Sequence, residues 1–86
     1  VKANIGHLEA AAGIAAIIKT VLCLTNNCIP AHRYAKNLNP RINLDAIPAI
    51  LATETQPWAS SDKSRHAGIS SFGFSGTNAH VILESV

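Results

Sequence analysis

The stretch that decides the fold is Lys2-Ala3-Asn4-Ile5-Gly6-His7-Leu8-Glu9-Ala10-Ala11-Ala12-Gly13, which leads into an apolar segment ending near Asn26. From Leu8 to Leu24 the spacing predicts a helix. Its only clearly polar residues are Glu9, Lys19 and Thr20. A helix that is apolar nearly all round is buried on most sides. We therefore expect a long buried helix with Lys2 and His7 at its N-terminal end.

The rest of the chain offers little material to cover such a helix. The chain has 86 residues, begins with Val1 rather than methionine, and much of it is typical of loops. Small domains bury a smaller share of their surface than large ones. We therefore expect residues 1–86 to be a piece of a larger domain. The alternative, a small binding domain that stands alone, predicts cooperative unfolding of these residues by themselves.

The composition excludes several functional classes. The chain is 48% hydrophobic and 14% charged, with a net charge of +2, and its seven basic residues are scattered without a cluster. This pattern gives no footprint for nucleic acid. The uncharged apolar run between Glu9 and Lys19 is too short to span a bilayer, and no signal peptide opens the chain. We expect a soluble cytoplasmic protein with no nucleic-acid or membrane partner.

The cysteines and histidines predict no metal site. Cys23 and Cys28 form neither a paired metal-ligand motif nor a disulfide framework. The four histidines do not fall at zinc-ligand spacing. Buried, reduced cysteines are the expected state.

The first half of the chain predicts one strand-prone segment before the helix and a long connection after it. Val1–Ile5 is β-prone, with Asn4 as a helix cap and Gly6 allowing a close turn. Asn26 and Asn27 should end the helix, and Pro30 agrees with that end. The residues from Cys28 to Pro48 predict an irregular, surface-hugging connection.

The second half predicts about three strands. Ala49–Thr55 is the first, ended by Pro57, after which Trp58 should anchor the strand against apolar surface. Ala59–Arg65 predicts a solvated turn. His66–Phe74 and Asn78–Glu84 predict two further strands.

The glycine-rich turn between the last two strands suggests a binding wall. Ser71-Phe72-Gly73-Phe74-Ser75-Gly76-Thr77-Asn78 has no lysine after the second glycine and precedes a strand, so it is not a phosphate loop. A plain hairpin loop remains open. However, two phenylalanines around a glycine suit a solvent-exposed turn poorly. We expect them to face a cavity that takes an apolar ligand.

His7 can be interpreted either as a catalytic residue or as a structural one. At a helix N-terminus the free N–H groups and the macrodipole disfavour added positive charge, so the ring should be neutral. A neutral imidazole can donate one N–H to a developing oxyanion. The alternative is a histidine that only packs at the helix end. Lys2 is either an ordinary exposed lysine or a cation that orients His7 or a bound acyl group.

Two long motifs resemble one enzyme family. Lys2-Ala3-Asn4-Ile5-Gly6-His7-Leu8-Glu9-Ala10-Ala11-Ala12-Gly13 resembles the Lys-x-Asn-x-Gly-His string of β-ketoacyl synthases. Gly68-Ile69-Ser70-Ser71-Phe72-Gly73-Phe74-Ser75-Gly76-Thr77-Asn78-Ala79-His80 resembles their closing motif. Both motifs are most similar to ketosynthase domains of modular type I polyketide synthases, and the resemblance covers the whole chain.

The resemblance implies a fold and a reaction. The family has a thiolase-like layered α/β fold of two stacked halves. Residues 1–86 look like most of the second half, with one long buried helix, a long connection and about three strands. In the family a cysteine takes an acyl group from an acyl carrier protein. Two histidines then assist decarboxylation of a malonyl-type extender and stabilise the enolate that attacks the acyl thioester.

The resemblance also assigns residues. His7 matches the second catalytic histidine, and Lys2 matches the lysine that supports it. Phe72 and Phe74 match the wall and gate of the acyl pocket, where Gly73 and Gly76 would be the hinges.

The family's nucleophilic cysteine and first histidine lie upstream of this chain. Cys23 cannot replace the nucleophile, because it lies roughly 24 Å down the helix from His7 at 1.5 Å per residue. The resemblance therefore implies that the chain alone is inert and binds no cofactor. The substrate would be a phosphopantetheine thioester on acyl carrier protein. The other implied partners are the N-terminal half of the same domain, a second copy in a homodimer and a neighbouring acyltransferase domain.

Alternatives within and outside this enzyme class stay open. The parent could be a non-elongating ketosynthase that acts as a relay or a dimerisation scaffold, or the condensing domain of a fatty acid synthase. A thiolase is disfavoured because Phe74-Ser75 stands where its second cysteine would be. Initiating and chalcone-type synthases are disfavoured because they carry asparagine in place of His7.

Overall fold

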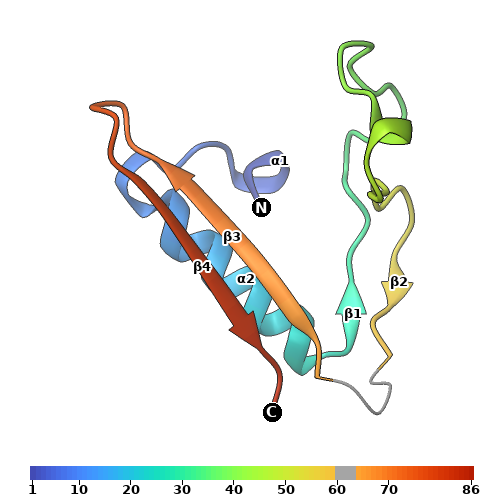
Figure 1. Ribbon diagram of the computed structural model, residues 1–86. Helices are drawn as coiled ribbons and strands as arrows, with labels where there is room; N and C mark the ends of the chain where they lie inside the picture. The colour runs from blue at the N-terminus through green and yellow to red at the C-terminus, as the bar shows by residue number, and fades with distance from the viewer. Residues whose placement is uncertain (60–63) are drawn as a thin grey trace.

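The computed structural model describes residues 1–59 and 64–86, in which the main helix runs along a long hairpin and an irregular arm of residues 28–59 lies beside them (Figure 1). The elements are α1 (Lys2–Ile5), the 3-10 turn η1 (Glu9–Ala11), α2 (Ala12–Thr25), β1 (Cys28–Ile29), the 3-10 turn η2 (Leu44–Ala46), β2 (Gln56–Pro57), β3 (His66–Phe72) and β4 (Asn78–Glu84). The chain therefore combines helix and strand as the α/β prediction requires.

The hairpin of β3 and β4 packs against α2 with one of its two faces. The strands are antiparallel, with Phe72 opposite Asn78 at the turn and His66 opposite Glu84 at the open end. Along β3 alternate residues are more buried, and Ile69 is the most buried of them. Ile69, Ala12 and Leu24 form the small core between hairpin and helix. The predicted strand Asn78–Glu84 is confirmed, whereas β3 ends two residues before Phe74.

The other face of α2 is uncovered within the described residues. Ile14, Ile18, Val21 and Leu22 are 45–55% exposed. They follow the i, i+4, i+7, i+8 spacing of a single helix stripe. Within the described residues, Ala12 and Leu24 are the buried residues of α2, so the expected burial of the helix on most sides is not seen in this chain. That these residues are a piece of a larger domain stays a prediction.

The helix begins later than the sequence indicated and ends where it indicated. Residues 9–11 form a 3-10 turn, so the α-helix starts at Ala12 and not at Leu8. Its N-cap position is Ala11, which has no capping side chain, so the expected cap at Asn4 is wrong. At the other end Asn27 adopts a left-handed φ of 52°, which suits asparagine and ends the helix.

The first residues are helical rather than extended. The N–H groups of Asn4, Ile5 and Gly6 donate to the carbonyls of Val1 and Lys2 at 2.9–3.2 Å, which closes one turn of helix. The β-prone interpretation of Val1–Ile5 is wrong because no strand lies beside this segment in the described structure. The expected close turn at Gly6 is confirmed by its φ of 77°.

The predicted strand Ala49–Thr55 is also wrong. Its residues make isolated bonds instead, such as His32 N–H to the Ala52 carbonyl at 2.7 Å. The ladder forms just after it, where β2 pairs with β1 through Cys28 opposite Pro57. Pro57 is therefore the last residue of a two-residue strand that starts at Gln56, rather than the end of a strand over residues 49–55, and such a short edge ladder tolerates proline.

Several smaller predictions can be compared with the structure. Cys23 and Cys28 are free thiols as expected, but they are half-buried rather than buried. The Trp58 side chain is half-buried, and the backbone N–H of Trp58 donates to the Asn27 carbonyl at 2.7 Å. The expected turn Ala59–Arg65 lies mostly outside the described residues. Within the part of the chain that is described, no helix has the length and apolar character needed to cross a membrane.

Candidate active site

His7 is held by the backbone of the 3-10 turn that follows it. The Glu9 N–H donates to His7 Nδ1 at 2.9 Å. A backbone amide can only donate, so the accepting Nδ1 carries no proton, and the proton of the neutral ring is on Nε2. Glu9 reaches this position with a left-handed φ of 49°, a conformation that a non-glycine residue rarely adopts. The bond leaves Nε2 as the ring nitrogen that can donate, and it comes from the backbone of a 3-10 turn rather than from the end of a long helix. The use of this donor in chemistry stays a prediction.

A pocket of about 780 Å³ lies between His7 and the tip of the hairpin. It is lined by His7, Glu9, Ala10, Ser71, Phe72, Gly73, Phe74, Thr77 and Ala79. The structure thus brings together His7 and three of the four residues predicted from the glycine-rich turn. Those segments are far apart in sequence and meet because the hairpin runs back along α2 to its N-terminal end (Figure 1).

The phenylalanines of the turn lie on this pocket and are also open to solvent. Phe72 is 76% exposed and Phe74 is 112% exposed. An aromatic side chain of this size is normally covered when it belongs to a finished surface. The two rings line the pocket while remaining exposed in this chain, and their role as wall and gate of an acyl pocket stays a prediction.

The two glycines of the turn have different reasons to be glycine. A Cβ on Gly73 would lie 2.8 Å from the Thr77 carbonyl oxygen, which also accepts the Gly73 N–H at 2.6 Å. Gly76 has open space around it but a φ of 95°, which L-residues rarely adopt. Both positions fix a tight turn, and their role as hinges stays a prediction.

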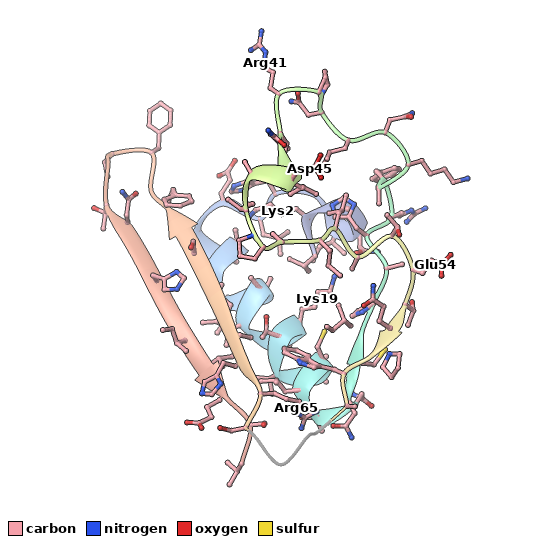
Figure 2. All side chains as sticks on the ribbon, turned by 45° about the vertical axis from the view of Figure 1, so that its right-hand side comes forward. Lys2, Lys19, Arg41, Asp45, Glu54 and Arg65 are labelled. Atoms are coloured by element: carbon pink, nitrogen blue, oxygen red, sulfur yellow. The ribbon has the colours of Figure 1, made fainter. Side chains whose placement is uncertain are left out.

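Lys2 lies apart from the His7 pocket. It lines a second cavity of about 250 Å³, on the side of α2 toward the residue 30–57 connection (Figure 2). Among the described residues, no hydrogen bond or ion pair joins Lys2 and His7. The support of His7 by Lys2 thus stays a prediction.

The sequence did not indicate three polar arrangements that the structure shows. Glu9 holds His7 through a backbone angle that no local motif specifies. Arg65 donates through Nη1 to Asn27 Oδ1 and, at 3.1 Å, to the Trp58 carbonyl, so it ties the end of α2 to the arm. On the outer hairpin face Ser70 Oγ and His80 Nδ1 lie 2.8 Å apart. Cross-strand pairs of this kind depend on register, which becomes visible only in the fold.

In residues 1–59 and 64–86, no group of three or more potential metal ligands comes together. The site as described is a histidine donor beside an apolar wall. Such a site suits stabilisation of an oxyanion next to an apolar acyl group.

Solved structures place this arrangement in a known fold class. The ketosynthase from module 6 of the bacillaene synthase of Bacillus subtilis superposes on the whole chain with a TM-score of 0.93 at 39% identity. An oxazolomycin ketosynthase domain from Streptomyces albus gives a TM-score of 0.91 at 41% identity. The chain covers 16% of each of those chains. The fold is that of one part of a thiolase-like ketosynthase.

Family models and curated relatives agree with the structures. Residues 1–36 match the beta-ketoacyl synthase C-terminal domain, and residues 39–86 match the ketoacyl-synthetase C-terminal extension. The chain belongs to the β-ketoacyl synthase family. It is 54% identical over 84 residues to a phenolphthiocerol/phthiocerol polyketide synthase of Mycobacterium tuberculosis and 50% identical to polyketide synthase GfsE of Streptomyces halstedii. Each match takes in 98% of this chain but only 6% and 2% of those relatives.

Proposed function

We propose that this chain is the C-terminal part of a β-ketoacyl synthase that performs decarboxylative Claisen condensation in polyketide biosynthesis. The observation that carries the proposal is the Glu9 N–H bond to His7 Nδ1, which leaves Nε2–H as a donor at a pocket walled by Phe72 and Phe74. Family membership supports the reaction class.

The proposed reaction begins with an acyl group held as a thioester on a cysteine upstream of this chain. A malonyl-type extender loses carbon dioxide, and the electrons of the broken bond form an enolate. His7 Nε2–H donates a hydrogen bond to the enolate oxygen as its negative charge grows. The enolate carbon then attacks the acyl carbonyl, and the cysteine leaves as a thiolate. His7 keeps its proton throughout, so the backbone bond from Glu9 needs no rearrangement during the reaction.

The remaining site residues have supporting roles in this proposal. Phe72 and Phe74 exclude water from the acyl pocket, which strengthens the bond that His7 donates. Gly73 and Gly76 shape the turn that carries Phe74 and act as its hinges. Lys2 supports His7 when the rest of the domain is in place.

The substrate and partners follow from the same proposal. Acyl and extender groups arrive as phosphopantetheine thioesters on acyl carrier protein, and the domain works as a homodimer beside an acyltransferase domain in the cytoplasm. The great length of the curated relatives supports a multidomain parent. The chain alone is expected to be inert, because neither Cys23 nor Cys28 lines the His7 pocket.

The experiment replaces His7 by alanine in the complete ketosynthase domain. Acyl transfer to the cysteine, followed by mass spectrometry, should survive, whereas condensation should fall by about 10²–10³-fold, the usual cost of losing one oxyanion donor. His66→Ala is the matched control, because that histidine lies on the exposed end of the hairpin. Unchanged condensation in His7→Ala would overturn the proposal. Acyl transfer without condensation in the wild type would identify a relay. A fatty acid synthase would be identified by a saturated product of its parent.

A further inference from the structure

The second cavity, beside α1 and α2, gathers positive charge without a counter-ion among the described residues. Its lining includes Lys2, Lys19 and Arg33, and it contains no aspartate or glutamate. Figure 2 shows Lys2 and Lys19 on this side of α2, whereas Glu54 lies at the outer edge of the arm. In the described parts of the chain the one ion pair is that of His66 and Glu84, far along the hairpin. Within residues 1–59 and 64–86, the cations at this cavity therefore have no acidic partner.

Lys19 is the informative member of this group. It is half-buried on the helix, although lysine is among the residues least often buried unless it is paired. Lys19 lines this cavity together with Lys2 and Arg33. Leaving a half-buried ammonium group without a partner is costly, and a carboxylate buried beside it would supply that partner.

The shape of the cavity distinguishes between kinds of anion. Its floor is made of the small side chains Ala3, Ala16 and Ala31, and its volume is about 250 Å³. An apolar floor suits the methylene stem of an acidic side chain better than a hydrated free phosphate. The one guanidinium, which would be the natural fork for phosphate, lies 5.8 Å over the Tyr34 ring instead. A single carboxylate between ammonium groups fits these features best.

We propose that an aspartate or glutamate from a part of the ketosynthase domain outside residues 1–86 enters this cavity and pairs with Lys19 beside Lys2. This inference rests on membership of the family and on the small share of a ketosynthase that the chain covers, 16%. It does not depend on the proposed reaction of His7. The pair would join α2 to the rest of the domain beside α1, the short helix that precedes His7.

A zero-length cross-link in the complete, unmodified ketosynthase domain tests the proposal directly. A water-soluble carbodiimide joins a lysine amine to a carboxylate only when the two are in contact, and peptide mass spectrometry identifies both partners. The expected product links Lys19 to an acidic residue outside residues 1–86. A link to any of the five acidic residues of this chain (Glu9, Asp45, Glu54, Asp62 or Glu84), or no link at Lys19, would overturn the proposal.

A second measurement on the same wild-type domain needs no variant to fold. Acetylation of Lys19 with acetic anhydride should be about tenfold slower than that of Lys36, a factor equivalent to about 1.4 kcal/mol. Lys36 is the matched control because it is exposed and does not line the cavity. Equal rates would contradict the proposal. Protection that appears only when inorganic phosphate is added at constant ionic strength would also contradict it, since the occupant would then be a free anion.

Discussion

Both faces of α2 carry apolar side chains, but the hairpin covers one face and leaves the other exposed. On one face Ala12 and Leu24 are 6% and 8% exposed, because the hairpin of β3 and β4 lies over them. On the other face Ile14 and Ile18 are each 55% exposed. A polar face would be expected if water were the permanent neighbour of the second stripe. The chain matches 16% of a solved ketosynthase, and we expect the exposed stripe to be covered by the rest of such a domain.

The same contrast applies to the active site. The side of the His7 pocket that the hairpin supplies is present, with Phe72, Phe74 and the turn in place. The other side is open, as the exposure of both aromatic rings shows. The hairpin therefore does two things: it covers one face of α2, and it forms one side of the His7 pocket.

The largest expected effect concerns the chain by itself. Residues 1–86 should show no cooperative unfolding transition, because Ala12, Leu24 and Ile69 are the core that the described structure contains. Urea titration followed by circular dichroism measures this. A sharp two-state transition in the isolated chain would mean that the uncovered face of α2 needs no cover.

The second effect compares one residue from each face in the complete ketosynthase domain. Leu24→Ala and Ile18→Ala should each lower the free energy of unfolding by about 2–5 kcal/mol, as for other large-to-small core changes. Denaturant unfolding of both variants beside the wild type measures the difference. If Ile18→Ala stays within about 0.5 kcal/mol of the wild type, as surface changes do, then the second face is not buried.

The third effect concerns the contact between α2 and β3. A Cβ on Gly13 would lie 3.4 Å from Ser71 Oγ, which is an ordinary contact distance. Gly13→Ala should therefore be tolerated, whereas Gly13→Leu should destabilise the domain by about 1–3 kcal/mol through overpacking. The two melting temperatures, measured side by side, check this expectation. Equal temperatures would show that the hairpin does not press on the helix here.

The smallest effect is expected at the open end of the hairpin. His66 Nε2 and Glu84 Oε1 are 3.4 Å apart, and their side chains are 58% and 59% exposed. Exposed ion pairs contribute about 0–1 kcal/mol. Glu84→Gln should therefore change the free energy of unfolding by less than about 1 kcal/mol, and added salt should reduce this change further because it screens exposed charges. A larger loss would indicate that the rest of the domain buries this pair.

The sequence was sufficient where a periodic pattern is long. The apolar run before Asn26 predicted the helix and its end, and the alternation in 78–84 predicted β4 with correct bounds. A helix pattern and a strand pattern repeat several times over such lengths, so tertiary context has little room to change them.

The sequence was insufficient where structure depends on a partner. Ala49–Thr55 has strand-forming residues but, in the described structure, no neighbouring strand along its length, so the ladder forms over two residues after it. Val1–Ile5 closes a single helical turn for the same reason. At the site, the residues of the glycine-rich turn were predicted from a motif; three of them line the same pocket as His7, and their binding role stays a prediction. The left-handed Glu9 and the cavity around Lys19 could not be predicted, because they arise from backbone geometry and from contacts between distant segments.

The measurement that tests the central claim most directly is the sequence of the coding region upstream of Val1 in the parent protein. If the chain is the second part of a working condensing enzyme, that region encodes a cysteine in a Thr-Ala-Cys-Ser-Ser-like turn and a histidine in a His-Gly-Thr-Gly-Thr-like loop. If either residue is replaced, the parent does not perform the condensation, and the Nε2–H donor of His7 serves a relay or a scaffold instead.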